Sequence, residues 1–249
     1  MEHFLIGLLV GSSLALTGSG GALLAIPLLI YFFNLPFKVA NFFSLIIVSL
    51  AALIGVVSDY KNVKFKKTLT IVFGSLLGSY LSLGLKSKLS DGFSLALLFM
   101  VCFLSLYFLW RPKKPADLKE EKEVSILNQL LIGAFLGILT TLTGLGGGVL
   151  LLPIFISVFG MDDHHAVATS LATIFLSSLI SFFLQFSFQE IYPKYSDFIF
   201  IISGAVVANY LVKKSIQRLS KARTLGLRKI SYSLIVIYTL VSISMKELL

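Results

Sequence analysis

The chain has 249 residues, of which 57% are hydrophobic and only 13% are charged. Soluble domains carry about 25% charged residues, so this composition excludes a water-soluble globular protein and equally a disordered chain. The net charge of +9 does not indicate nucleic-acid binding, because most Lys and Arg residues lie in short segments between long apolar runs. That distribution is typical of membrane proteins whose orientation is set by cytoplasmic positive charge.

Long apolar runs follow one another along the chain. A helix that spans a membrane needs about 20 mostly apolar residues, and almost no ionisable residue interrupts these runs. The pattern therefore predicts an all-α polytopic protein that crosses the cell membrane several times. The only cysteine, Cys102, lies inside a run, which excludes a disulfide framework and a cysteine metal site. The runs are 4–33, 39–58, 68–85, 93–110, 126–159, 166–189, 198–212 and 230–245.

The chain carries an internal repeat. A shift of 126 residues matches 16 of the 42 positions in 4–45, and the matches include Gly, Thr, Pro and Ser, which shared Leu-richness does not explain. We therefore predict two homologous helical halves, 1–110 and 126–249, joined by a charged cytoplasmic linker over 111–125. The matched pairs include Gly7 and Gly133, Gly11 and Gly137, Thr17 and Thr143, Gly18 and Gly144, Pro27 and Pro153, Ser44 and Ser170, and Gly78 and Gly204.

Two glycine-rich breaks interrupt the longest runs, 4–33 and 126–159. Each break lies between arms of about 14 and 12 apolar residues, and neither arm reaches the ~20 residues of a full span. Clustered glycines end one helix and start another, whose unpaired N–H groups and positive dipole end suit a small anion. Repeated halves with matching interruptions predict a transporter whose site lies at the breaks. The alternative is that these glycines only allow close packing, as Gly7, Gly11, Gly74, Gly78, Gly133 and Gly137 are expected to do.

Polar side chains flank the two breaks. Ser44 and Ser170 lie on the helices that follow the breaks, and Asn41, Thr169 and Thr173 share or adjoin that face, where they could donate hydrogen bonds to an oxyanion. The alternative is that these side chains bond their own backbone or a neighbouring helix. The residues predicted to bind substrate are Thr17, Gly18, Ser19, Gly20, Gly21, Asn41, Ser44, Thr143, Gly144, Gly146, Gly147, Gly148, Thr169, Ser170 and Thr173.

A histidine pair follows two aspartates in the second half only. With Asp162 and Asp163, His164 and His165 could bind a metal or relay protons, but a helix cap formed by Asp163 beside solvated histidines is favoured. No Asp or Glu lies deep inside an apolar run, so a coupled proton would be carried by these histidines or by the substrate itself. We expect no metal, no cofactor and no catalytic residue.

The second break belongs to a longer motif. Thr-Gly-Leu-Gly-Gly-Gly-Val-Leu-Leu-Leu-Pro (143–153) followed by His-His-Ala-Val-Ala-Thr-Ser-Leu (164–171) resembles the sulfite exporter TauE/SafE family. The first half has a looser copy, in which Asn41-Phe42-Phe43 replaces the Val-Ala-Thr of the second. The resemblance covers nearly the whole chain. It implies a polytopic inner-membrane permease for sulfur-containing anions such as sulfite, sulfonates or sulfoacetate.

The sequence as a whole predicts a secondary transporter for small anions. Sulfur oxyanions such as sulfite or organosulfonates would bind near the midplane at the two breaks. A passive anion channel is the alternative, and a membrane-embedded enzyme is disfavoured because no nucleophile–base or metal constellation occurs in the membrane. The expected partners are the small anion and the lipid bilayer, not nucleic acid, and a homo-oligomer is left open.

Loop charges distinguish two topologies. In the first, each broken run crosses the membrane once and the halves are parallel. In the second, each broken run is a re-entrant hairpin and the halves are inverted. Segment 59–67 has four lysines, whereas the corresponding segment 185–197 has one. Segment 213–229 has seven basic residues, whereas the corresponding segment 86–91 has two. Cytoplasmic positive charge favours the inverted arrangement, which is expected to bring the two glycine tips together.

Overall fold

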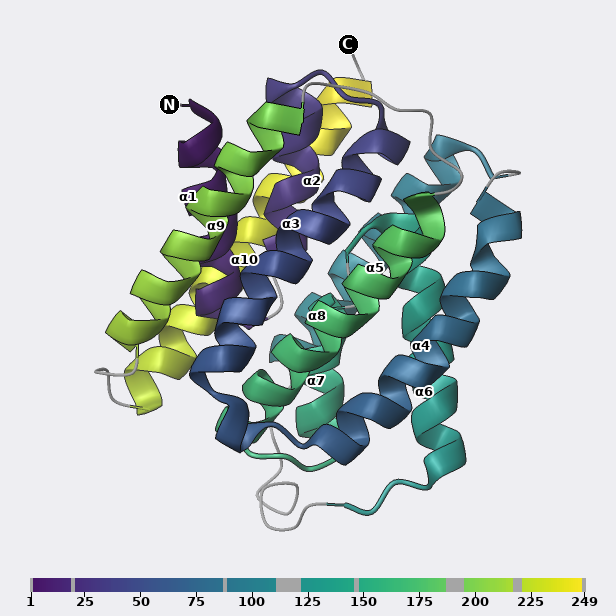
Figure 1. The fold of residues 1–249 in the computed structure, drawn as a ribbon, viewed down its shortest axis with the longest axis vertical. Coiled ribbons are helices and arrows are strands. Elements are labelled where there is room, and N and C mark those ends of the chain that lie inside the picture. Colours follow the sequence, from purple (N-terminus) through teal and green to yellow (C-terminus); the bar gives the residue numbers. More distant parts are fainter. Residues whose placement is uncertain are drawn as a thin grey trace.

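The computed structural model describes residues 2–18, 21–86, 89–110, 122–145, 148–186, 195–216 and 221–247. These residues form α-helices and one 3₁₀ turn, without a strand, as the composition predicts (Figure 1). The elements are α1 (Glu2–Thr17), α2 (Gly21–Phe32), α3 (Phe37–Ser58), η1 (Tyr60–Asn62), α4 (Phe65–Lys86), α5 (Asp91–Trp110), α6 (Ile126–Thr143), α7 (Gly148–Ser157), α8 (Asp163–Phe186), α9 (Tyr195–Ile216) and α10 (Lys221–Glu247).

Five of the helices, α3, α4, α6, α8 and α9, are long and apolar enough to cross a membrane. Their outward faces carry large apolar side chains, for example Phe73, Leu77 and Leu81 along α4 and Ile199 and Phe200 on α9, all of them exposed. Exposed apolar surface of this extent marks contact with lipid rather than water. The predicted linker over 111–125 falls mostly on residues outside the described ranges.

The helices on either side of each glycine-rich segment return to the end of the molecule from which they start. The ring of His3, at the start of α1, lies 4.8 Å from that of Phe33, just after α2. In the other half, the N–H of Lys122, before α6, donates to the Phe159 carbonyl, after α7 (2.9 Å). The Lys67 ammonium lies 5.4 Å from the Phe159 ring, so the second pair starts from the end where α4 begins.

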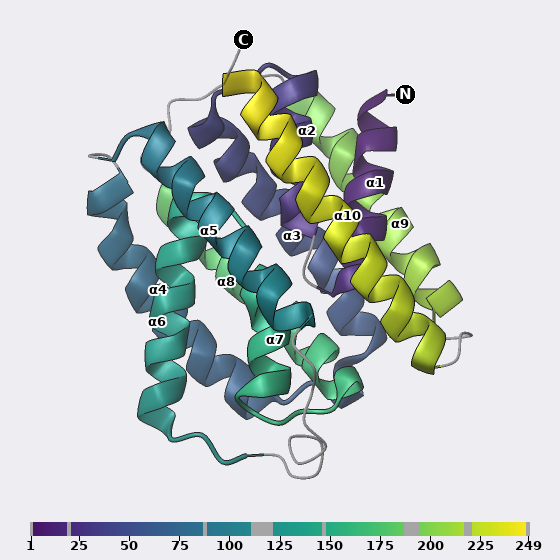
Figure 2. The same ribbon diagram turned by 180° about the vertical axis from the view of Figure 1, so that it is seen from behind.

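The two helix pairs therefore enter from opposite ends (Figures 1 and 2). We call the end that holds Lys67, Lys122 and Phe159 the basic end. The arms have 16, 12, 18 and 10 residues, so the first arm of each pair is longer than the 14 residues expected. These two first arms are longer than expected because α1 begins at Glu2 and because α6 begins after Ser125, which caps it by accepting a hydrogen bond from the Asn128 N–H (3.3 Å).

The first helix of each half packs along a helix of the other half. A Cβ atom added to Gly7 or Gly11 on α1 would overlap the main chain of α9 at Ile201 or Ala205. On α6, a Cβ atom added to Gly133 or Gly137 would overlap the main chain of α4 at Ile71 or Ser75. These glycines thus let the paired backbones approach closely.

The same contacts correct the alignment by one helical turn. Gly204 meets the Phe4 carbonyl, and Gly74 meets the Leu130 carbonyl at the corresponding position. Within the predicted repeat, these contacts pair Gly204 with Gly74 rather than with Gly78.

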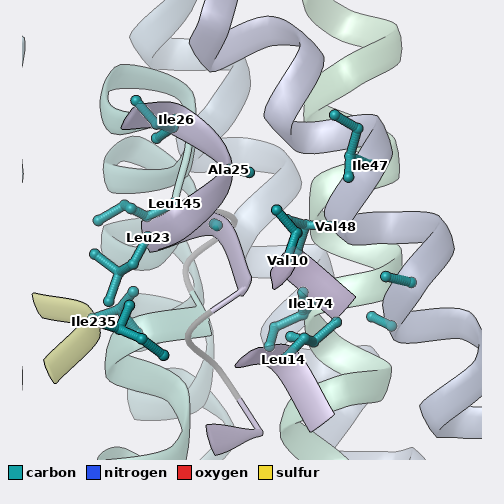
Figure 3. Packing of buried hydrophobic residues seen from close by; sticks show 14 of the residues in the cluster. Val10, Leu14, Leu23, Ala25, Ile26, Ile47, Val48, Leu145, Ile174 and Ile235 are labelled. Atoms are coloured by element: carbon teal, nitrogen blue, oxygen red, sulfur yellow. The ribbon is translucent and has the colours of Figure 1, made fainter. Parts of the chain in front are cut away.

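The main apolar core takes buried side chains from all of helices α1 to α10, and Figure 3 shows the part of it around α1, α2 and α3. Val10 and Leu14 of α1 lie near Ile47 and Val48 of α3, and all four are fully or almost fully buried. Gly18 and Gly21 on one side and Gly144 and Gly148 on the other, the described residues that bound the two breaks, are all buried and thus shielded from lipid, as a break at membrane depth requires.

Two glycines of α4 give a matched test of this packing. Gly78→Ala should lower the melting temperature in detergent, because its Cβ would overlap the Ala134 carbonyl and overpacking costs about 1–3 kcal/mol. Gly84→Ala should leave the melting temperature unchanged or slightly higher, since nothing lies within 4 Å of the added atom. Equal losses in the two variants would contradict the interpretation.

Candidate functional site

Both glycine breaks use a left-handed glycine to end a helix. Gly18 follows α1 with φ of 71°, and Gly144 follows α6 with φ of 74°. Glycine adopts this conformation without the steric cost that other residues meet. The N–H groups of Gly18 and Gly144 bond the carbonyls of Leu14 (2.8 Å) and Thr140 (2.9 Å). The predicted site residues Ser19, Gly20, Gly146 and Gly147 lie outside the described residues.

The carbonyl of each left-handed glycine lies within hydrogen-bonding distance of a serine hydroxyl from the other half. Ser44 Oγ on α3 lies 2.9 Å from the Gly144 oxygen, and Ser170 Oγ on α8 lies 3.1 Å from the Gly18 oxygen. Ser44 and Ser170 are themselves matched by the 126-residue shift. Each hydroxyl has a single proton and also lies close to the carbonyl three residues earlier, that of Asn41 (2.7 Å) or Val167 (2.9 Å), so main-chain carbonyls occupy the proton that was predicted to bind an anion.

The two left-handed glycines do not meet. Ser49 Oγ on α3 donates to the Phe175 carbonyl on α8 (3.0 Å), so Ser49 and Phe175 lie at the same height along these two antiparallel helices. Ser44 precedes Ser49 by five residues, and Ser170 precedes Phe175 by five. At 1.5 Å per residue the glycines lie about 7–8 Å to either side of that level, roughly 15 Å apart. Gly18 and Gly144 themselves are therefore apart, because the long first arms carry them past the middle; the prediction that the glycine tips come together also concerns residues 19–20 and 146–147, which lie outside the described residues.

The starts of α2 and α7 lie nearer the middle than the left-handed glycines. A Cβ atom added to Gly21 would lie 2.9 Å from Leu14 Cβ, one turn back along α1 from Gly18. On α10, Thr239 Oγ1 donates to the Leu23 carbonyl (2.8 Å) and the Tyr232 hydroxyl to the Val149 carbonyl (3.4 Å).

Thr239 and Tyr232 fix the relative position of these two helix starts. Seven residues of α10 separate them, or about 10 Å along the helix. Because α2 runs toward one end of the molecule and α7 toward the other, both N-terminal ends point toward the middle. A helix N-terminus presents unpaired N–H groups and positive potential, so two opposed ends are suited to hold a small anion between them.

The buried threonines of the predicted site bond main-chain atoms. Thr17 and Thr143 donate to the carbonyls of the residues four positions earlier, both at 2.7 Å, and Thr173 donates to the Thr169 carbonyl (2.8 Å). Thr169 Oγ1 accepts from the Lys64 N–H (3.2 Å). This pattern favours the alternative of backbone bonding for the hydroxyls, and it leaves main-chain N–H groups as the donors for an anion.

Asn41 makes the two breaks chemically different. Its Nδ2 donates to the carbonyls of Leu142 (3.1 Å) and Thr141 (3.4 Å), in the last turn of α6. Val167 occupies the equivalent position against Gly18, where an added Cβ would lie 3.2 Å from Val167 Cγ1. An amide therefore faces one break and an apolar side chain faces the other.

The histidine pair lies at the start of α8, at the basic end. His164 is exposed and His165 half-buried. Asp162 Oδ2 accepts from the His164 N–H (3.3 Å), and Asp162 Oδ1 lies 3.8 Å from His165 Nδ1. The capping residue is thus Asp162 rather than Asp163, because α8 begins one residue earlier than the expected cap requires.

Two basic residues near the breaks were not singled out by the sequence. Lys213 donates to the Gly55 carbonyl near the end of α3, and its ammonium lies 3.5 Å from Asp59 Oδ2. Arg228 Nε donates to the Leu16 carbonyl at the end of α1 (3.2 Å). Each cation satisfies carbonyls at a helix C-terminus, where positive charge is favourable. In the sequence they are only part of a basic segment, and only the fold brings them to these helix ends.

Comparison with known proteins gives a consistent match. A model of the sulfite exporter TauE/SafE family matches residues 3–244. The chain is 30% identical over 207 residues to the probable membrane transporter protein YjnA of Bacillus subtilis, covering 75% of this chain and 79% of that one. It is 29% identical over 182 residues to the probable membrane transporter protein MJ0441 of Methanocaldococcus jannaschii, covering 70% and 68%. No solved structure gives a significant match.

Alanine at the two left-handed glycines should have unequal effects. Both changes impose a strained backbone, at about 1–2 kcal/mol. At Gly144 the new Cβ would also lie 2.7 Å from Asn41 Cγ and 2.9 Å from its Cα, whereas at Gly18 the nearest atom is a Val167 methyl at 3.2 Å. Gly144→Ala should therefore lower the melting temperature in detergent more than Gly18→Ala. Equal melting temperatures would show that Asn41 yields as easily as Val167.

Proposed function

The chain belongs to the sulfite exporter TauE/SafE family, and from this premise we propose that it is a secondary transporter for small anions, with sulfur oxyanions such as sulfite or organosulfonates as substrates. It is a multi-pass membrane protein, as its apolar helices and its membrane-transporter relatives indicate. The proposal concerns the substrate, its binding site and the mode of transport.

The opposed N-termini of α2 and α7 carry this proposal. The substrate would lie between them, near the middle of the membrane, and accept hydrogen bonds from main-chain N–H groups. The carbonyls that end α1 and α6 would repel an anion, but the hydroxyls of Ser44 and Ser170, shared between these oxygens and the carbonyls of Asn41 and Val167, partly offset their charge. Backbone recognition of this kind requires no cationic side chain in the membrane interior.

We also infer that the two halves, 1–110 and 126–249, are inverted repeats joined by the linker 111–125. Three pairs of contacts support this: α1 on α9 and α6 on α4, Ser44 on Gly144 and Ser170 on Gly18, and Asn41 and Val167 against the same two glycines. Each pair is related by the repeat. Basic side chains at one end of the bundle support a cytoplasmic location for that end.

Alternating access would follow from this arrangement. Each hairpin is anchored through its glycine face on a helix of the other half, so a hairpin and its anchoring helix can move as one body against the central pair α3 and α8. Proton coupling, if the cycle has it, would run through His164 and His165 at the basic end or through a proton on the substrate.

Flux measurements separate this proposal from a passive anion channel. In proteoliposomes loaded with unlabelled sulfite, a carrier should accelerate the entry of labelled sulfite, and the rate should saturate. Gly20→Val and Gly146→Val should reduce this exchange to background while insertion into the membrane persists, since a Cβ would fill the space of the anion. Linear, non-exchanging flux would favour a channel, and wild-type exchange in both variants would limit the glycines to packing.

Cysteine labelling tests the hairpins. In a Cys102→Ala background, single cysteines at the exposed positions Asn34 and Asp162 are treated from outside with an impermeant maleimide. Asn34→Cys should label, because both topologies place it outside. Asp162→Cys should label only after permeabilisation if 126–159 is a hairpin that returns to the cytoplasm. Labelling of Asp162→Cys in intact cells would instead mean that this run crosses the membrane.

A further inference from the structure

We propose that Asn41 recognises a hydrogen-bond donor on the substrate at the break between α6 and α7, so that the transported anion carries an O–H group. A singly protonated oxyanion and a hydroxylated sulfonate both have this chemistry. The inference rests on the proposed function and names the substrate class more narrowly.

The orientation of the Asn41 side chain is fixed by its neighbours. Its Nδ2 donates to the carbonyls of Leu142 and Thr141 at the C-terminal end of α6. Rotating the amide by half a turn would place Oδ1 against these two oxygens, where it could not bond. The nitrogen therefore belongs on the α6 side, and it is not the donor to an oxyanion that the sequence suggested.

The other end of the amide is an acceptor without a donor. Asn41 is completely buried, and its Oδ1 has no hydrogen-bond partner among the described residues. A Cβ atom added to Gly144 would lie 2.8 Å from this oxygen, so Oδ1 lies directly against the break. A buried acceptor that lacks a donor is unfavourable, and a ligand that supplies the donor removes the penalty.

The repeat provides an internal comparison. Val167 holds the equivalent position at the other break and contacts Gly18 through its methyl groups. The serine contact is the same at both breaks, so closing the break does not require an amide. Only the break between α6 and α7 thus has a side-chain acceptor beside it. The features that the two breaks share do not account for this acceptor.

Two opposite preferences then select the substrate. Main-chain N–H groups at the helix N-termini favour negative charge, whereas a carbonyl oxygen beside the break disfavours an anion that offers only lone pairs. An anion with one donor satisfies both. A site that bonds a substrate hydroxyl discriminates strongly against an analogue without one, because the site's own polar group is then left unpaired.

Hydroxymethanesulfonate and ethanesulfonate form a matched pair of probes, since they share charge and head group and differ by a hydroxyl in place of a methyl. In proteoliposomes, the wild-type protein should prefer hydroxymethanesulfonate by about tenfold or more. Asn41→Leu, which is similar in size, should abolish the preference, whereas Val167→Ala should keep it. Ethanesulfonate flux and the melting temperature in detergent report whether each variant is folded and active, because neither depends on the contact between Asn41 and a hydroxyl.

Each other outcome is distinct. Equal transport of both probes by the wild-type protein overturns the inference, even if no variant can be purified. A preference that survives Asn41→Leu removes Asn41 from it. Flux that requires Na⁺ and ignores the hydroxyl would overturn it in favour of a cation at Asn41. Absence of any flux for sulfite and both sulfonates would instead overturn the proposed function.

Discussion

Main-chain polar groups cannot be left unpaired in a membrane, and this constraint shapes every feature around the two breaks. Each broken helix presents carbonyls on one side and N–H groups on the other. The carbonyls have partners: Ser44 and Ser170 bind left-handed glycines, Asn41 binds the end of α6, and Arg228 binds the end of α1. These side-chain donors therefore bind carbonyls, and this is why we propose the N-termini of α2 and α7 as the place where an anion binds.

The second organising feature is the exchange of helices between halves. Glycines on α1 and α6 bring each helix into backbone contact with α9 or α4 of the other half. Helices from different halves are therefore packed as closely as helices within one half. This explains why the first helix of each pair can be long. Where it extends past the middle, its terminal glycine carbonyl contacts a serine hydroxyl on α3 or α8 of the opposite half.

Features that depend on residue type along one segment were predictable from the sequence. The helical class, the expected close-packing glycines and the transporter family follow from hydropathy, spacing and motif. Features that depend on which segments meet were not predictable. The separation of Gly18 and Gly144, the capping role of Asp162 and the helix-end contacts of Lys213 and Arg228 all arise from three-dimensional neighbours. The sequence shows that Asn41 is polar, but only its partners on α6 determine that its unpaired side-chain atom is an acceptor.

The contact between Gly7 and Ile201 also sets a timing problem for biosynthesis. These residues are 194 positions apart, so at about 5–20 residues per second the ribosome needs roughly 10–40 s to produce the partner of α1. During this interval the flat glycine face of α1 must rest against lipid, an insertase or a chaperone. Helix α1 therefore reaches this native neighbour only after α9 has been synthesised.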